Sequence, residues 1–403
     1  MTGALAAPWR GTPAGWLRTW LVILAGVCGP VTLAAEPIII PAPPQMAASA
    51  YLLIDADSGK TLVEHNSRQR LPPASLTKIM TSYIAAGEIA SRRLALTDSV
   101  LVSEKAWKKG GSKMFIRVGT EVLVEDLLKG IVIQSGNDAS IAMAEHIAGS
   151  EDAFADIMNQ HAQLLGMEDS NFRNATGWPD DEHFTSARDL ATLSRALIKR
   201  YPEHYAMYAE KEYRYNEIDQ QNRNLLLWRD RSVDGVKTGH TEAAGYCLVA
   251  SALRDGMRLV SVVMGTNSME ARARESQKLL SYGFRYYATH TPYSAETSLR
   301  DVRVWGGDAA TVGLGVPDDV TITVPRGAAE QLTAKLDLSP VFRAPLSKGD
   351  ETGKLTVMYG EEIVYEGPLV ALSEVPEAGA FSSFVDAVSL FFLELFGGDP
   401  LAV

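Results

Sequence analysis

The sequence predicts an α/β sandwich with a helical lobe, followed by a small all-β domain and a C-terminal amphipathic helix. Strand-like runs near the start of the folded region return after a long helical stretch, which is the order of a sheet interrupted by a helical insert. Short alternating runs follow beyond residue 290, and an apolar stripe at helical spacing marks the last residues. We expect a signal peptide at 1–35, a linker at 36–45, the α/β domain at 46–288, the all-β domain at 289–375 and an amphipathic tail at 376–403.

The composition limits the possible partners. The chain has 403 residues, of which 46% are hydrophobic and 22% charged, so it is long enough for more than one buried core. Its formal net charge of -11 argues against a nucleic-acid partner, because a protein that binds phosphates normally carries a basic face. The seven histidines are scattered without metal-ligand spacing, so we expect neither a metal nor another cofactor.

The first residues predict an export signal. Arg10 and Arg18 supply positive charge, and an apolar run over 20–27 leads to small residues that end at Ala35. The alternative is a retained membrane anchor, but the run is shorter than the roughly 20 apolar residues that a span needs. Removal of the signal would leave Cys247 as the last cysteine, so we expect no intramolecular disulfide.

The α/β domain begins with two strand-like runs that are joined by turn residues. A helical pattern follows two prolines, four more helical patterns come next, and then two strands lie on either side of Asp255-Gly256, a hairpin signal. A last helix closes the domain. The segments are 50–55, 61–63, 74–89, 124–133, 139–147, 153–165, 186–199, 246–253, 258–264 and 269–287.

The tail carries a broad apolar stripe that ends at Gly397-Gly398. A helix of about sixteen residues rises only about 24 Å, and Asp386 and Glu394 would lie in the hydrocarbon, so it is not expected to span a bilayer. We expect it to lie on a membrane surface through aromatic and aliphatic burial, since its polar face lacks basic residues. The alternative is a helix docked on its own protein or a dimer contact. The stripe consists of Phe381, Phe384, Val385, Val388, Phe391, Phe392, Leu395 and Phe396.

Three short motifs in a fixed order carry the predicted chemistry: 75–78 (SLTK), 135–137 (SGN) and 237–239 (KTG). Ser75 and Lys78 emerge one turn apart on one helix face, so a neutral Lys78 can take the serine proton. Burial beside a second cation, which Lys237 could supply, would lower the pKa of Lys78 to that end. The backbone N–H of Ser75 lies where an oxyanion would form.

The other two motifs predict groups that handle a substrate. Ser135 can relay a proton to a leaving amine, and Asn137 can hold a substrate amide. Taken singly, Ser75 is better explained as a helix cap and Lys78 as a solvated charge, but three motifs in this order are hard to obtain by chance.

The third motif is expected to precede a strand. Lys237 and Thr238 offer a cation and a hydroxyl to a carboxylate, and Gly239 leaves room for a close approach of the substrate backbone. The N–H of His240 is the natural second oxyanion donor.

The sequence around the motifs resembles a known family. Residues 72–81 (PPASLTKIMT), 135–139 (SGNDA) and 233–241 (VDGVKTGHT) resemble the penicillin-recognising serine enzymes. In detail they are similar to the low-molecular-mass D-alanyl-D-alanine carboxypeptidases of the penicillin-binding protein 5 type. The resemblance implies a serine β-lactamase or transpeptidase-like catalytic domain, a C-terminal β-sandwich and a terminal anchor helix.

The resemblance also implies an activity and a location. Such an enzyme removes the terminal D-alanine from the pentapeptide stem of peptidoglycan, is acylated by β-lactams, and lies in the periplasm against the outer face of the inner membrane. By the same resemblance Arg272 and Arg223 would hold the terminal carboxylate, the alternative being two surface arginines. Gly136 stands where class A β-lactamases carry aspartate, so fast β-lactam hydrolysis is not expected. A β-lactamase, a D,D-endopeptidase and a non-enzymatic envelope protein remain the rival interpretations.

Overall fold

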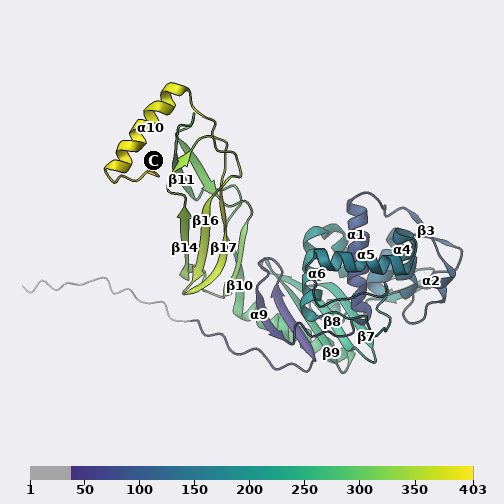
Figure 1. Ribbon diagram of the computed structural model, residues 1–403. Coiled ribbons are helices and arrows are strands. Elements are labelled where there is room, and N and C mark those ends of the chain that lie inside the picture. The colour runs from purple at the N-terminus through teal and green to yellow at the C-terminus, as the bar shows by residue number, and fades with distance from the viewer. Residues whose placement is uncertain (1–37, 403) are drawn as a thin grey trace, which may run out of the picture. The chain divides into compact units, whose positions relative to one another are not determined.

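The computed structural model describes residues 38–402, so the predicted signal peptide lies outside the described residues. Figure 1 shows an α/β unit, a β-rich unit and the C-terminal helix along this part of the chain. Within it, no helix is both long enough and apolar enough to cross a bilayer.

The α/β unit is built on a five-stranded antiparallel sheet in the order β2-β1-β9-β8-β7. Strands from the beginning and the end of the unit therefore share one sheet, as the sequence predicts. The strands are β1 (Ala50–Asp55), β2 (Thr61–His65), β7 (Val233–Thr241), β8 (Gly245–Arg254) and β9 (Met257–Thr266).

Helices cover both faces of this sheet because its strands are apolar on both sides. Leu52 and Ile54 pack into the cluster formed with the helices of the lobe, whereas Leu53 between them points to the opposite cluster, beneath the last helix of the unit. Figure 1 shows the lobe helices gathered beside the sheet. The principal helices are η1 (Ala74–Thr77), α1 (Lys78–Ala90), α3 (Val124–Lys129), η2 (Gly130–Gln134), α4 (Asn137–Ala148), α5 (Glu151–Leu164), α6 (Ala187–Arg200) and α9 (Met269–Tyr286).

Short elements that the sequence analysis did not predict complete the lobe. They are β3 (Ser99–Leu101), α2 (Glu104–Lys108), β4 (Glu121–Leu123), α7 (Pro202–Tyr205), η3 (Ala206–Ala209), β5 (Glu212–Tyr215), β6 (Ile218–Gln221) and α8 (Leu226–Arg229).

The third motif lies in a strand that was not predicted. Residues 237–239 precede the strand β8, as predicted, but they themselves lie inside β7, at one edge of the sheet. The strand β7 was missed because Gly235 and Gly239 interrupt the apolar pattern, and glycines inside a strand are read as turn residues.

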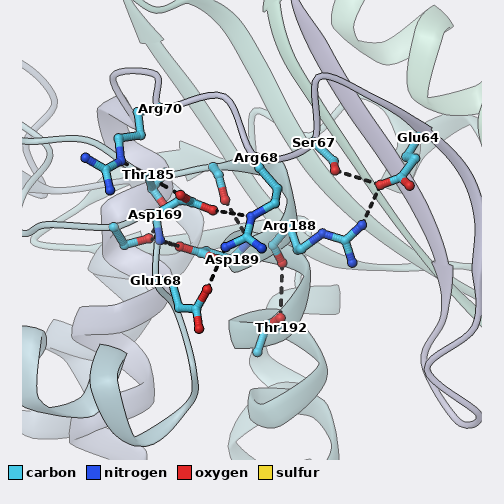
Figure 2. A network of polar contacts seen from close by, with 12 residues as sticks. Glu64, Ser67, Arg68, Arg70, Glu168, Asp169, Thr185, Arg188, Asp189 and Thr192 are labelled. Carbon is cyan, nitrogen blue, oxygen red and sulfur yellow. Dashed lines mark hydrogen bonds and ion pairs between the residues drawn. The ribbon is translucent and has the colours of Figure 1, made fainter.

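Polar contacts fix the segment that leads into η1, as Figure 2 shows. Arg68 pairs with Glu168 at 2.7 Å and with Asp169 at 2.8 Å. Such exposed pairs are worth about 0–1 kcal/mol each. Backbone hydrogen bonds also hold this segment, since Leu71 and Thr185 exchange N–H···O bonds of 2.8 and 3.0 Å. The chain therefore enters η1 from an anchored position.

The second unit is all-β, as predicted. One sheet has the order β14-β16-β17-β12-β11-β15, and β10 pairs with β13. Its strands are β10 (Tyr287–Tyr293), β11 (Arg300–Trp305), β12 (Thr311–Gly315), β13 (Val320–Pro325), β14 (Leu332–Leu338), β15 (Phe342–Arg343), β16 (Glu351–Tyr359) and β17 (Glu362–Ala371), with the 3₁₀ turn η4 (Ala329–Gln331). The predicted fold class is confirmed, while the domain boundaries stay predictions.

The tail forms the helix α10 (Ala380–Leu395). Asp386 accepts hydrogen bonds from the Gly306 N–H at 2.9 Å and from Arg303 at 3.2 Å, and Leu390 is buried against the same unit. The eight residues of the predicted stripe are all exposed. The helix is thus held by one face and leaves its apolar face open.

Candidate active site

A short helical turn, residues 74–78, brings Ser75 and Lys78 together. Ser75 is the second residue of η1, and α1 begins at Lys78, so the two side chains lie one turn apart. The Lys78 Nζ donates to the Ser75 Oγ at 3.0 Å. When Lys78 is neutral, its lone pair can accept the Ser75 O–H across the same distance, which is the contact that a base needs in order to take the serine proton.

Lys78 is fully buried and has three polar neighbours. Besides Ser75, its Nζ contacts the Asn137 Oδ1 at 2.8 Å and the Thr176 carbonyl oxygen at 2.6 Å. A neutral amine has two N–H donors and one lone pair. The two pure acceptors can take both donors, which leaves the lone pair for the hydroxyl of Ser75.

Burial favours this neutral form. The pKa of Lys78 is lowered from 10.5 to about 7, first by burial and then by the positive charge of Arg223. Burial beside a second cation is the predicted cause, and burial is indeed the largest one. The leading charge is that of Arg223, whereas Lys237 was suggested for this role.

Lys237 is the second buried amine of the site, with 3% of its surface exposed. Its pKa lies well below 10.5, first because of burial and then because of the charge of Lys78. Its ammonium has one weak partner, the Thr238 carbonyl oxygen at 3.3 Å. An anion bound beside it would supply the missing interaction.

Ser135 and Asn137 lie between two helices. Ser135 ends the π-helical turn η2 with a φ of 66°, and its buried Oγ has no hydrogen-bond partner among the described residues. Such backbone strain is found where a side chain must be aimed at a site. Asn137 begins α4, and its Nδ2 donates to the Gly110 carbonyl at 2.8 Å, so its Oδ1 faces Lys78.

The strand β7 supplies the opposite wall with Thr238, Gly239 and His240. A Cβ on Gly239 would lie 2.9 Å from the Pro73 carbonyl oxygen and 3.1 Å from the Leu76 Cγ. The glycine is therefore needed for the strand to pack against the turn that carries Ser75, a reason that we did not predict.

The two predicted arginines differ in their surroundings. Arg272 is buried, donates to the Gly239 carbonyl at 3.0 Å, and has its pKa lowered to about 10 by burial. The alternative of a surface arginine is wrong for this residue. Arg223 is exposed and donates to the Ser112 Oγ at 2.7 Å, at the rim of the same cleft.

One cleft of about 490 Å³ joins these groups. Lys78 and Lys237 lie beneath its surface, and all the other predicted site residues line it. They are Ser75, Ser135, Asn137, Arg223, Thr238, Gly239, His240 and Arg272.

Sequence reasoning missed one wall of the cleft, the loop 173–178. Its Thr176 carbonyl accepts from Lys78, and Gly177 and Trp178 line the cleft. No sequence signal identifies a backbone carbonyl as a partner, since every residue carries one. Among residues 38–402, no cluster of three metal-ligating side chains occurs.

Comparison with known proteins covers nearly the whole chain. The family profile of D-alanyl-D-alanine carboxypeptidases matches residues 38–268, and that of the penicillin-binding protein 5 C-terminal domain matches residues 287–377. Escherichia coli K12 D-alanyl-D-alanine carboxypeptidases DacA and DacC are each 42% identical to the chain. DacA aligns over 89% of this chain and 91% of its own length, and DacC over 96% and 97%. The crystal structure of Haemophilus influenzae penicillin-binding protein 5 is 40% identical and superposes with a TM-score of 0.80, over 84% of this chain and all of its own.

Proposed function

The chain belongs to the D-alanyl-D-alanine carboxypeptidase family, and on that premise we propose that its cleft removes the terminal D-alanine from peptidoglycan pentapeptides through an acyl-enzyme on Ser75. One observation supports this most directly. A serine hydroxyl lies 3.0 Å from a buried amine whose pKa is lowered to about 7, so a base is available at neutral pH.

The proposed reaction has two halves. The Lys78 lone pair takes the proton of Ser75, whose Oγ attacks the carbonyl carbon of the penultimate D-alanine. The N–H groups of Ser75 and His240 hold the resulting oxyanion. The C–N bond then breaks, and Ser135 passes a proton from Lys78 to the departing D-alanine amine. Water attacks the ester in the second half, with Lys78 again as the base, and restores Ser75.

The carboxylate of the terminal residue is proposed to bind beside β7. Thr238 offers a hydroxyl, while Lys237, Arg272 and Arg223 offer positive charge. Asn137 would hold the substrate amide from the other wall of the cleft. A β-lactam carries a carboxylate and a strained amide in similar positions, which supports covalent inhibition at the same serine.

The test is the substitution Ser75→Ala. It should abolish D-alanine release from a pentapeptide and covalent labelling by a fluorescent penicillin, because it removes the hydroxyl that forms the ester. Ser91→Ala, an exposed serine at the end of α1, is the matched control and should leave both unchanged. Mass spectrometry should locate the penicillin adduct on Ser75. Labelling of the Ser75→Ala protein would refute the assignment.

We also propose that the protein is exported and lies on the outer face of the inner membrane. The predicted signal at 1–35 supports export, and the open apolar face of α10 supports attachment to a bilayer surface. Such a placement keeps the cleft near newly made peptidoglycan.

A further inference from the structure

One buried histidine connects the loop 173–178 to the turn that carries the nucleophile. His183 is 3% exposed, and its Nε2 lies 2.9 Å from the Oγ1 of Thr77. Thr77 is fully buried, and in the sequence it lies between Ser75 and Lys78. On its other side, the Nδ1 of His183 lies 3.2 Å from the backbone nitrogen of Arg173 and 3.2 Å from the Nδ2 of Asn174.

These contacts define the tautomer of the ring. The Arg173 N–H can only donate, so the His183 Nδ1 must accept. Burial lowers the pKa of His183 to about 4, so at neutral pH the ring carries a single proton, on Nε2. That proton is donated to the Thr77 hydroxyl oxygen. His183 is therefore an oriented link with one end on the loop and the other on the turn.

The loop itself is ordered by Asn174. Its Oδ1 accepts from the N–H groups of Thr176, Gly177 and Trp178 at 2.9–3.1 Å. Since the Nδ2 of Asn174 faces His183, the ring also fixes the side chain that shapes the loop.

The loop also packs closely against the turn. Gly177 has a φ of +79°, and a Cβ on it would lie 1.7 Å from the Ala74 carbonyl oxygen. The chain just before the loop is held by two contacts in the region of Figure 2: the Asp169 N–H donates to Asp189 at 2.9 Å, and the hydroxyls of Ser170 and Thr185 lie 2.7 Å apart.

The position of this loop matters to Lys78. The Thr176 carbonyl takes one of the two N–H donors of the neutral amine, and the Asn137 Oδ1 takes the other. Without the carbonyl, the amine would be free to turn, and an N–H instead of the lone pair could face Ser75. A small displacement of a reacting group is enough to slow a reaction strongly.

We propose that His183 is a positioning residue for acylation: by bridging the loop 173–178 to Thr77, it holds the Thr176 carbonyl where it orients the Lys78 base. This inference rests on the proposed roles of Ser75 and Lys78. It assigns to His183 no contact with substrate.

Two near-isosteric variants separate this role from general stabilisation. In His183→Gln, the amide nitrogen can reach Thr77 as Nε2 does, but the acceptor at Nδ1 toward Arg173 is lost. In His183→Asn, the amide oxygen can replace Nδ1 toward Arg173 but cannot reach Thr77. Stopped-flow labelling with a fluorescent penicillin gives the saturating acylation rate and the half-saturating concentration for each full-length variant. His65→Asn, at an exposed histidine, is the control.

Each variant breaks one end of the bridge, so the bridge predicts that both lose activity. His183→Gln and His183→Asn should each acylate about ten- to a hundredfold more slowly than the parent, with half-saturating concentrations within about twofold of the parent. Thr77→Val should resemble His183→Asn, and the two changes combined should add little. A parent-like acylation rate for either histidine variant, or an effect confined to the half-saturating concentration, would overturn the proposal. Labelling that survives Ser75→Ala would instead mark a failure of the proposed function.

Discussion

The catalytic cleft and the C-terminal helix depart from ordinary folding rules in opposite directions. In the cleft, Lys78 and Lys237 are 0% and 3% exposed, although lysine is almost never fully buried. In α10, Phe381 and Phe396 are 83% and 82% exposed, although phenylalanine is usually inside. Each arrangement opposes the stability or solubility of the chain, so each is best explained by what it does for function.

The largest effect is expected at α10, on the binding of the protein to a bilayer. The double change Phe384→Glu and Phe391→Glu should lower binding to phosphatidylcholine vesicles by more than about tenfold, since each buried phenylalanine contributes about 1.5–3 kcal/mol. Vesicle flotation measures the binding, and the acylation rate with penicillin should not change. Ser382→Glu combined with Ser389→Glu places the same two charges outside the stripe and is the control.

Two results would break this half of the comparison. Unchanged flotation of the double variant would show that the apolar face does not meet the bilayer. A double variant that sediments more slowly than the parent protein would point to a second copy of the chain as the partner of α10.

The cleft can be probed through the pH dependence of acylation. Lys78 must be neutral to act as a base, so the saturating acylation rate should rise with pH through about 7. Arg223→Ala removes a positive charge that lowers the pKa of Lys78, so the rising limb should move to higher pH. Arg92→Ala, at an exposed arginine, should leave the profile in place. A limb that stays fixed, or moves to lower pH, would contradict the assignment of Lys78 as the base.

The sequence predicts much of this architecture because its signals are local. The strands at 50–55 and 246–264 and the helices between them follow from periodicity, and the turn at 74–78 follows from a motif with fixed spacing. The motif 237–239 was placed before a strand because glycines disrupt the strand pattern. What remained hidden is non-local chemistry, such as the Thr176 carbonyl beside Lys78, since no residue type marks a backbone acceptor.

The charges of the cleft show the same limit. The motifs suggested that Lys78 and Lys237 are close. Burial lowers the pKa of both amines, and the charge of Lys78 also lowers the pKa of Lys237. The leading charge on Lys78 comes from Arg223, which is distant in sequence from both. His183 likewise looked like one of several scattered histidines, and its role depends on a contact across 106 residues.

The smallest expected effect concerns the stability cost of a buried amine. Lys237→Met should raise the free energy of unfolding by about 1 kcal/mol at neutral pH, because it removes a buried amine with one weak hydrogen bond and keeps a similar volume. The unfolded lysine keeps its proton up to about pH 10.5, whereas the folded one releases it at lower pH, so the parent gains stability as pH rises and the advantage of methionine should shrink. Denaturant unfolding measures the difference, and Lys237→Ala, which leaves a cavity, should be less stable than Lys237→Met. A Lys237→Met protein that is less stable than the parent at neutral pH would show that the amine stabilises the fold. Of the two regions, only α10 would then carry an arrangement that opposes the stability or solubility of the chain.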